Sequence, residues 1–143
     1  MANWYGAARS NYVLIKDLVA LRETLDPWPI GIHKKHQDDS DNNVLVCFLS
    51  EEQDSGGWPS ICWIDGDNDE TEFDPVQLIC PHMVEGQVLV MMEVGHEKLR
   101  VLTGHAVAYY HDGKEVHVDL DDIYEKAANA FGVDRSSVTS ATY

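Results

Sequence analysis

The middle of the chain lacks positive charge. Between His36 and Glu97 there is no lysine or arginine, although the 143-residue chain has ten of them. The same stretch carries fifteen of the 25 carboxylates, so the ten cations elsewhere are balanced by the ten remaining acids. The whole formal net charge of -15 therefore belongs to this stretch. We expect such a chain to repel nucleic acids and anionic membranes and to attract a basic protein surface. We also expect the fifteen acids to form one contiguous negative face or rim, with the ten cations elsewhere.

Cysteines are few and long apolar runs are missing. Cys47, Cys62 and Cys80 are widely spaced without a Cys-x-x-Cys pair, and their odd number predicts reduced thiols. No run approaches the roughly 18 apolar residues of a membrane span. The first twelve residues also lack the apolar core of a signal peptide. We therefore expect a cytoplasmic protein without a membrane partner.

The known catalytic and metal-binding motifs are missing as well. The chain has no His-Glu-x-x-His, no zinc-finger spacing, no Gly-x-Ser-x-Gly and no phosphate-binding glycine loop. His105 and His111 are six residues apart, which in a strand separates them by about 20 Å, too far for a shared metal. We therefore expect no catalytic residue, no metal and no cofactor, and a protein that is not an enzyme.

Length and composition predict a single domain over residues 1–143, because 44% hydrophobic residues suffice for one core. Strands are predicted at residues 11–16, 30–35, 44–50, 61–64, 87–94, 98–111 and 114–120. Helices are predicted at residues 18–25, 75–80 and 121–131. The expected fold class is α+β: a mainly antiparallel sheet of six or seven strands with two or three helices packed on one face.

Several residues predict where these elements begin, bend and end. Asp17 and Asp74 are candidate helix N-caps, and Gly132 is a candidate C-cap. Asp112 and Gly113 predict a hairpin turn, and Gly104 predicts a bend or bulge in the preceding strand. The helix at 121–131 is expected to turn one apolar side inward, made of Ile123, Ala127, Ala130 and Phe131.

The segment DGDNDETEFD, residues 65–74, holds six carboxylates and no cation. An EF-hand starting at Asp65 would need glycine where Glu70 stands and glutamate where Val76 stands, which argues against calcium. In an extended segment alternate side chains lie about 6.6 Å apart, close to two phosphate steps of about 3.4 Å. This spacing permits imitation of a nucleic-acid backbone, and a merely solvated loop stays open as the alternative. The predicted partner-binding residues are Asp54, Asp65, Asp67, Asp69, Glu70, Glu72 and Asp74.

Two other functions remain open from the aromatic and basic residues. The segment NWYGAARSNYV could form an edge that binds a ligand. Alternatively, Trp4 and Tyr12 could plug one end of the hydrophobic core. An interaction module could instead bind through an aromatic patch of Trp4, Tyr5 and Trp58. A small-ligand binder or enzyme could use Arg9 and histidines in a pocket.

Four segments, in this order, resemble a group of short acidic accessory proteins of tailed phages and plasmids: NWYGAARSNYV, GGWPS, MEVGHEKLR and DDIYEKAANAFGV. That group has no assigned activity, so the resemblance implies only a context, namely a mobile element acting in the bacterial cytoplasm. In this context we predict a non-enzymatic inhibitor of the anti-CRISPR or anti-restriction type. It would imitate DNA and block the cationic nucleic-acid-binding surface of a host defence protein.

Overall fold

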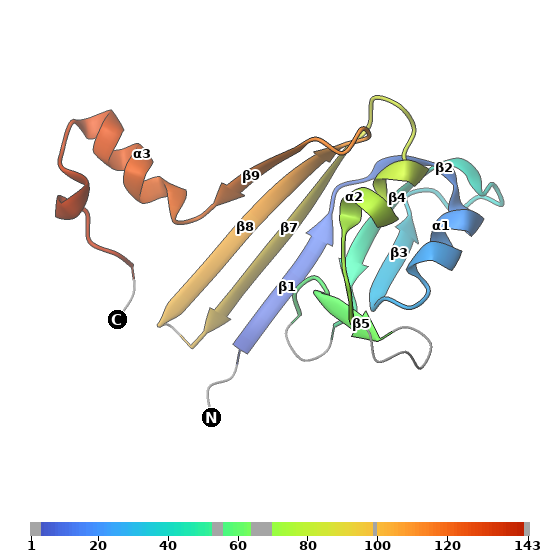
Figure 1. Ribbon diagram of the computed structural model, residues 1–143, viewed down its shortest axis with the longest axis horizontal. Coiled ribbons are helices and arrows are strands. Elements are labelled where there is room, and N and C mark those ends of the chain that lie inside the picture. The colour runs from blue at the N-terminus through green and yellow to red at the C-terminus, as the bar shows by residue number, and fades with distance from the viewer. Residues whose placement is uncertain (1–3, 53–55, 64–69, 99, 142–143) are drawn as a thin grey trace.

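The computed structural model describes residues 4–52, 56–63, 70–98 and 100–141 of the chain (Figure 1). The elements in chain order are β1 (Trp4–Ser10), β2 (Val13–Asp17), α1 (Leu18–Leu25), β3 (Ile30–Lys34), β4 (Asn42–Ser50), β5 (Ile61–Trp63), β6 (Glu70–Glu72), α2 (Pro75–Leu78), the 3-10 turn η1 (Cys80–His82), β7 (Val88–Glu97), β8 (Val101–Tyr110), β9 (Glu115–Asp119), α3 (Asp122–Phe131) and the 3-10 turn η2 (Arg135–Ser137). None of the described helices is long and apolar enough to cross a membrane.

One antiparallel sheet of seven strands forms the centre of the fold, which confirms the predicted α+β class. Strands β2, β4, β1, β7, β8 and β9 are neighbours in this order, and β3 pairs with the other edge of β4. Helices α1 and α2 pack on one face, which we call the inner face. The core lies between these helices and the sheet, around Ile15, Phe48 and Leu89, all of which are fully buried.

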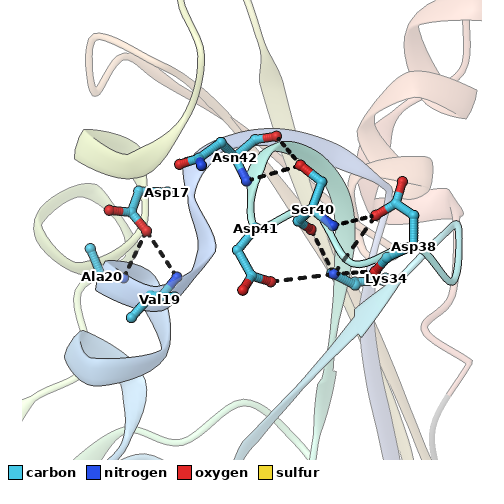
Figure 2. Close-up of polar contacts among 8 residues, drawn as sticks. All are labelled: Asp17, Val19, Ala20, Lys34, Asp38, Ser40, Asp41 and Asn42. Atoms are coloured by element: carbon cyan, nitrogen blue, oxygen red, sulfur yellow. Dashed lines mark hydrogen bonds and ion pairs between the residues drawn. The ribbon is translucent and has the colours of Figure 1, made fainter.

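Helix α1 follows β2 without a connecting loop because Asp17 caps it. The Asp17 carboxylate accepts hydrogen bonds from the backbone N–H groups of Val19 and Ala20, at 3.0 and 3.2 Å (Figure 2). The predicted cap is thereby confirmed, and two otherwise unsatisfied donors of the first turn find an acceptor. Leu21 and Leu25, on the helix side that faces the sheet, are buried.

The N-terminal segment forms a strand, β1, that the sequence patterns did not predict. It pairs with β7 along its whole length, and its first residue, Trp4, lies opposite Glu97. Trp4 and Tyr12 remain 40% and 39% exposed, so the expectation that they plug one end of the core is wrong. The prediction failed because glycine and two alanines in WYGAARS weaken the strand pattern, and only pairing with β7 and β4 supports it.

Two polar residues hold the chain where it passes from β1 to β2. The Ser10 hydroxyl, in a buried residue, accepts a hydrogen bond from the backbone N–H of Phe48 at 2.8 Å. The Asn11 side chain donates to the carbonyl of Val88 at 3.0 Å and accepts from the N–H of Val90 at 2.8 Å. At the passage from β1 to β2, these side chains supply the hydrogen bonds that a neighbouring main chain supplies elsewhere in the sheet.

The segment predicted as a strand at 61–64 does not join the main sheet. It forms β5, which pairs with β6 in a separate two-stranded sheet, with Ile61 opposite Glu72. The seventh strand of the main sheet is β1 instead. Residues 70–72, for which no strand was predicted, are thus a strand. Acidic residues have a low strand propensity, so this strand forms because it pairs with β5.

The long hairpin of β7 and β8 keeps one register from Val88 opposite Tyr110 to Glu97 opposite Val101. The predicted bend at Gly104 is therefore wrong. A Cβ at Gly104 would lie 2.9 Å from the Leu120 side chain, so glycine is needed for that close approach. The predicted turn at Asp112 and Gly113 is confirmed, with a φ of 93° at Gly113.

Helix α3 lies beyond β9 and leaves the sheet (Figure 1). Its predicted C-cap is confirmed, because Gly132 adopts the left-handed conformation that ends the helix. The expectation that its apolar side turns inward is wrong, since Ile123 is 59% and Phe131 77% exposed and Ala130 is also exposed. The buried residue of α3 is Ala128, on another side of the helix.

Candidate functional site

The structure separates the predicted partner-binding residues. Asp54, Asp65, Asp67 and Asp69 lie outside the described residues. Glu70 and Glu72 are the first and last residues of β6, and Glu72 is exposed.

Asp74 has a structural role that the other predicted residues lack. It is the N-cap of α2, and its carboxylate accepts a hydrogen bond from the N–H of Val76 at 3.0 Å. The side chain is half-buried, so its charge is partly used inside the fold. The cap was predicted from the Asp-Pro pair, and its confirmation weakens the assignment of Asp74 to a partner surface.

The described acids of the cation-free stretch do not form one continuous face. Asp38, Asp39, Asp41 and Glu85 lie near the end of the sheet where β4 and β7 begin. Glu51 and Glu52 follow the end of β4, whose nine residues separate them from the first group by about 30 Å, and Glu72, the last residue of β6, lies near Trp58 and Glu93. The expectation of a single acidic face is therefore wrong for these residues.

At the first end, a lysine pairs with two of the four acids (Figure 2). Lys34 Nζ lies 3.8 Å from the carboxylate of Asp38 and 3.3 Å from that of Asp41. It also donates hydrogen bonds to the carbonyls of Asp38 and Ser40 at 2.9 and 2.7 Å. These acids therefore help to hold the turn between β3 and β4.

At the second end, the acids keep their charge. Within the described ranges, no lysine or arginine lies within 4 Å of the carboxylates of Glu51, Glu52 or Glu72. We call these three residues the acidic end.

A cleft of about 390 Å³ opens on the inner face beside β7 and β8. Its polar groups include Glu93 and His105, whose side chains lie 3.4 Å apart on neighbouring strands. Trp58 also lines it, and its indole Nε1 is buried without a hydrogen-bond partner among the described residues. Burial, followed by the nearby charge of Glu115, raises the pKa of Tyr109 on the cleft wall. The cleft offers hydrogen-bond donors and an acid but no activated nucleophile.

The histidines and carboxylates do not gather into a metal site in the parts of the chain that the structure describes. No group of three or more histidine, cysteine, aspartate or glutamate side chains is placed to hold a metal there. Cys47 and Cys80 are buried free thiols, and burial raises the pKa of Cys80.

The residues of the two alternative functions are not brought together. Trp4 covers Gly95 on the inner face, where Trp58 lines the cleft, but Tyr5 lies on the opposite face and stacks on His96 with ring centroids 5.4 Å apart. Arg9 shares that opposite face, on the other side of the sheet from the His105 cleft. Neither a three-residue aromatic patch nor a pocket with Arg9 and His105 is formed.

The feature that the sequence patterns missed is the face opposite the inner one, over β1, β7, β8 and β9. We call it the bare face, because no described helix covers it. Its residues, by strand register, are Tyr5, Ala7, Arg9, Val88, Val90, Met92, Val94, His96, Leu102, Gly104, Ala106, Ala108, Tyr110, Val116, Val118 and Leu120. Neither aspartate nor glutamate is among them. The signal was present in QVLVMMEV, whose alternate residues are apolar on both sides of the strand.

Comparison of the chain with protein-family models, with curated proteins and with solved structures found no match. A functional assignment therefore depends on the geometry and charge of the molecule itself.

Proposed function

We propose that the chain is a non-enzymatic accessory protein of a mobile element that binds the cationic nucleic-acid-binding surface of a host defence protein. The observation that carries the proposal is the acidic end, where Glu51, Glu52 and Glu72 have no cation within ion-pair distance among the described residues. Unpaired carboxylates can bind the lysines and arginines that otherwise hold phosphates.

The division of the acids restricts the proposal to one end of the sheet. Asp38 and Asp41 are engaged by Lys34, whereas the acidic end is contiguous in sequence with Asp54 and with the segment 65–69. Glu70 and Glu72 repeat at a spacing close to two phosphate steps. The partner surface is thus proposed to include Asp54, Asp65, Asp67, Asp69, Glu70 and Glu72.

The test measures protection from two defined defence systems, a type I restriction enzyme and a CRISPR nuclease. The chain should compete with a labelled DNA duplex for at least one of them, and the competition should weaken with added salt. Replacing Asp67, Asp69, Glu70 and Glu72 by their amides should weaken binding by about five-fold to several hundred-fold, since exposed pairs contribute roughly 0.2–1 kcal/mol each.

A matched control removes the same charge elsewhere. Amide substitutions at Glu23, Asp39, Glu85 and Asp134, which are exposed and are not part of the acidic end, should leave the competition nearly unchanged. Equal loss in both quadruple variants would show that total charge, and not this surface, is recognised. No competition for either enzyme at low salt would contradict the proposal.

A further inference from the structure

We propose that the chain forms a two-fold symmetric dimer in which α3 of each copy packs on the bare face of the other. The inference concerns a different surface from the acidic end and is independent of the function proposed for it. Both halves of the interface are present in each chain: an apolar sheet face that lacks a helix, and an amphipathic helix that lacks a sheet.

The sheet half is larger than an ordinary apolar surface patch. Nine large apolar side chains of the bare face are between 38% and 71% exposed: Tyr5, Val88, Met92, Val94, Leu102, Tyr110, Val116, Val118 and Leu120. Each side chain has an area on the order of 150 Å², and about half of it is exposed. Together they present roughly 700 Å² of apolar surface. Patches on monomers reach about 300–600 Å². A stable interface buries about 800 Å² per partner, so this face with α3 reaches the required area.

The helix half is the side of α3 that carries Ile123, Ala127 and Phe131. The neighbouring Tyr124, three residues before Ala127 and seven before Phe131, is already engaged: its hydroxyl accepts a hydrogen bond from the N–H of Ala141 at 2.8 Å. Arg135 also stacks on the Tyr124 ring, with its guanidinium carbon 4.9 Å from the centroid. The C-terminal turn therefore covers Tyr124 but leaves Ile123 and Phe131 59% and 77% exposed.

The dimensions of the two halves agree. Ten helical residues make α3 about 15 Å long. Four neighbouring strands make the bare face about 14 Å wide, and the ten residues of β7 make it about 30 Å long.

The link to β9 directs the helix away from its own sheet. The Leu120 N–H bonds the Gly104 carbonyl at 2.9 Å, and the Asp119 N–H bonds the Asp122 carboxylate at 2.8 Å. With both ends of this two-residue link fixed, α3 extends beyond the sheet (Figure 1). The bare face that it can cover therefore belongs to another molecule.

Charge identifies that molecule as a second copy. Two chains of net charge -15 repel each other, but the bare face carries no carboxylate and includes Arg9 and His96. It is the surface through which such acidic chains can approach while their acids stay in solvent.

The experiment is sedimentation equilibrium of the full chain and three variants. The wild type should sediment at twice the 16.1 kDa of the chain at micromolar concentrations. Phe131→Glu and Val116→Glu, at positions 77% and 71% exposed in the single chain, should raise the dissociation constant by about 30-fold or more without unfolding it. Val19→Glu, 50% exposed on α1 and away from the bare face, is the matched control and should remain dimeric.

Salt separates this interface from the acidic end. Dimerisation should hold or strengthen from about 10 mM to about 150 mM salt, because screening reduces the repulsion between acidic chains. Competition with DNA should weaken over the same range. A wild type that stays monomeric at about 100 µM would overturn the proposed dimer, whatever else the bare face binds. A dimer whose dissociation constant is unchanged by Phe131→Glu would also overturn it. Neither result would affect the proposed function.

Discussion

Single residues with conspicuous chemistry serve the fold in several places. Asp74 belongs to the acidic segment by sequence, yet its carboxylate caps α2. His82 lies beside Thr24, with Nε2 3.2 Å from the hydroxyl oxygen, and burial lowers its pKa from the usual 6.5. In both residues the environment, and not the residue type, determines the role.

The lowered pKa of His82 predicts a loss of stability in acid. The unfolded chain takes up a proton near pH 6.5, whereas the folded chain does so only at lower pH. The free energy of unfolding should therefore fall as pH decreases below about 6.5 and through the folded pKa. The measurement is urea unfolding at about pH 7.5 and about pH 5.5. Between these two pH values the free energy of unfolding should fall less for His82→Gln than for the wild type.

The control is His33→Gln, at an exposed position on β3. It should keep the wild-type difference between the two pH values. If His82→Gln also kept that difference, burial of His82 would not contribute to acid sensitivity.

Elements of similar composition have different roles because their neighbours differ. Strand β4 lies between β3 on one edge and β2 and β1 on the other, and it carries buried residues such as Val46 and Phe48. Strand β9 is the edge of the sheet, and all five of its residues are exposed. An isolated amphipathic helix such as α3 has little reason to be stable in water by itself, which fits its packing against a second chain.

The turn between β3 and β4 should depend on Lys34. Lys34→Met removes two hydrogen bonds to carbonyls and two ion pairs around a side chain that is only 18% exposed. We expect the free energy of unfolding to fall by about 2 kcal/mol, since hydrogen bonds to charged groups contribute roughly 1.5–3 kcal/mol and partial exposure reduces this. Urea unfolding measures it.

The matched variant is Lys126→Met, on the exposed surface of α3. Its effect should stay within about 0.5 kcal/mol. An equal effect of the two substitutions would mean that the removal of a positive charge from an acidic protein, and not the turn, accounts for the loss at Lys34.

The whole molecule has an excess of negative charge, yet one face of its sheet carries no carboxylate. Described acids lie beyond both ends of β4 and in the cleft of the inner face, whereas the bare face carries no carboxylate. This separation allows one surface for a basic partner and another for a second copy. The two proposals therefore require no shared residue.

Net charge also predicts how salt changes the stability of the fold. Like charges repel most in the compact state, and raising ionic strength from about 10 mM to about 150 mM shortens the screening length from about 30 Å to about 8 Å. We expect the melting temperature, measured at a protein concentration where the chain is monomeric, to rise by a few degrees. The melting temperature of the amide variant at Glu23, Asp39, Glu85 and Asp134 should rise less, and a wild-type melting temperature that falls with salt would contradict this expectation.

The sequence by itself determined the α+β class, the caps at Asp17, Asp74 and Gly132, and the turn at Gly113, because these follow from local backbone preferences. The tertiary structure decided the rest. Pairing between distant segments made strands of residues 4–10 and 70–72, and it divided the acids between two ends of the sheet. It also left the apolar sides of β7, β8 and α3 exposed, because hydrophobic periodicity marks a side that packs without specifying which chain it packs against.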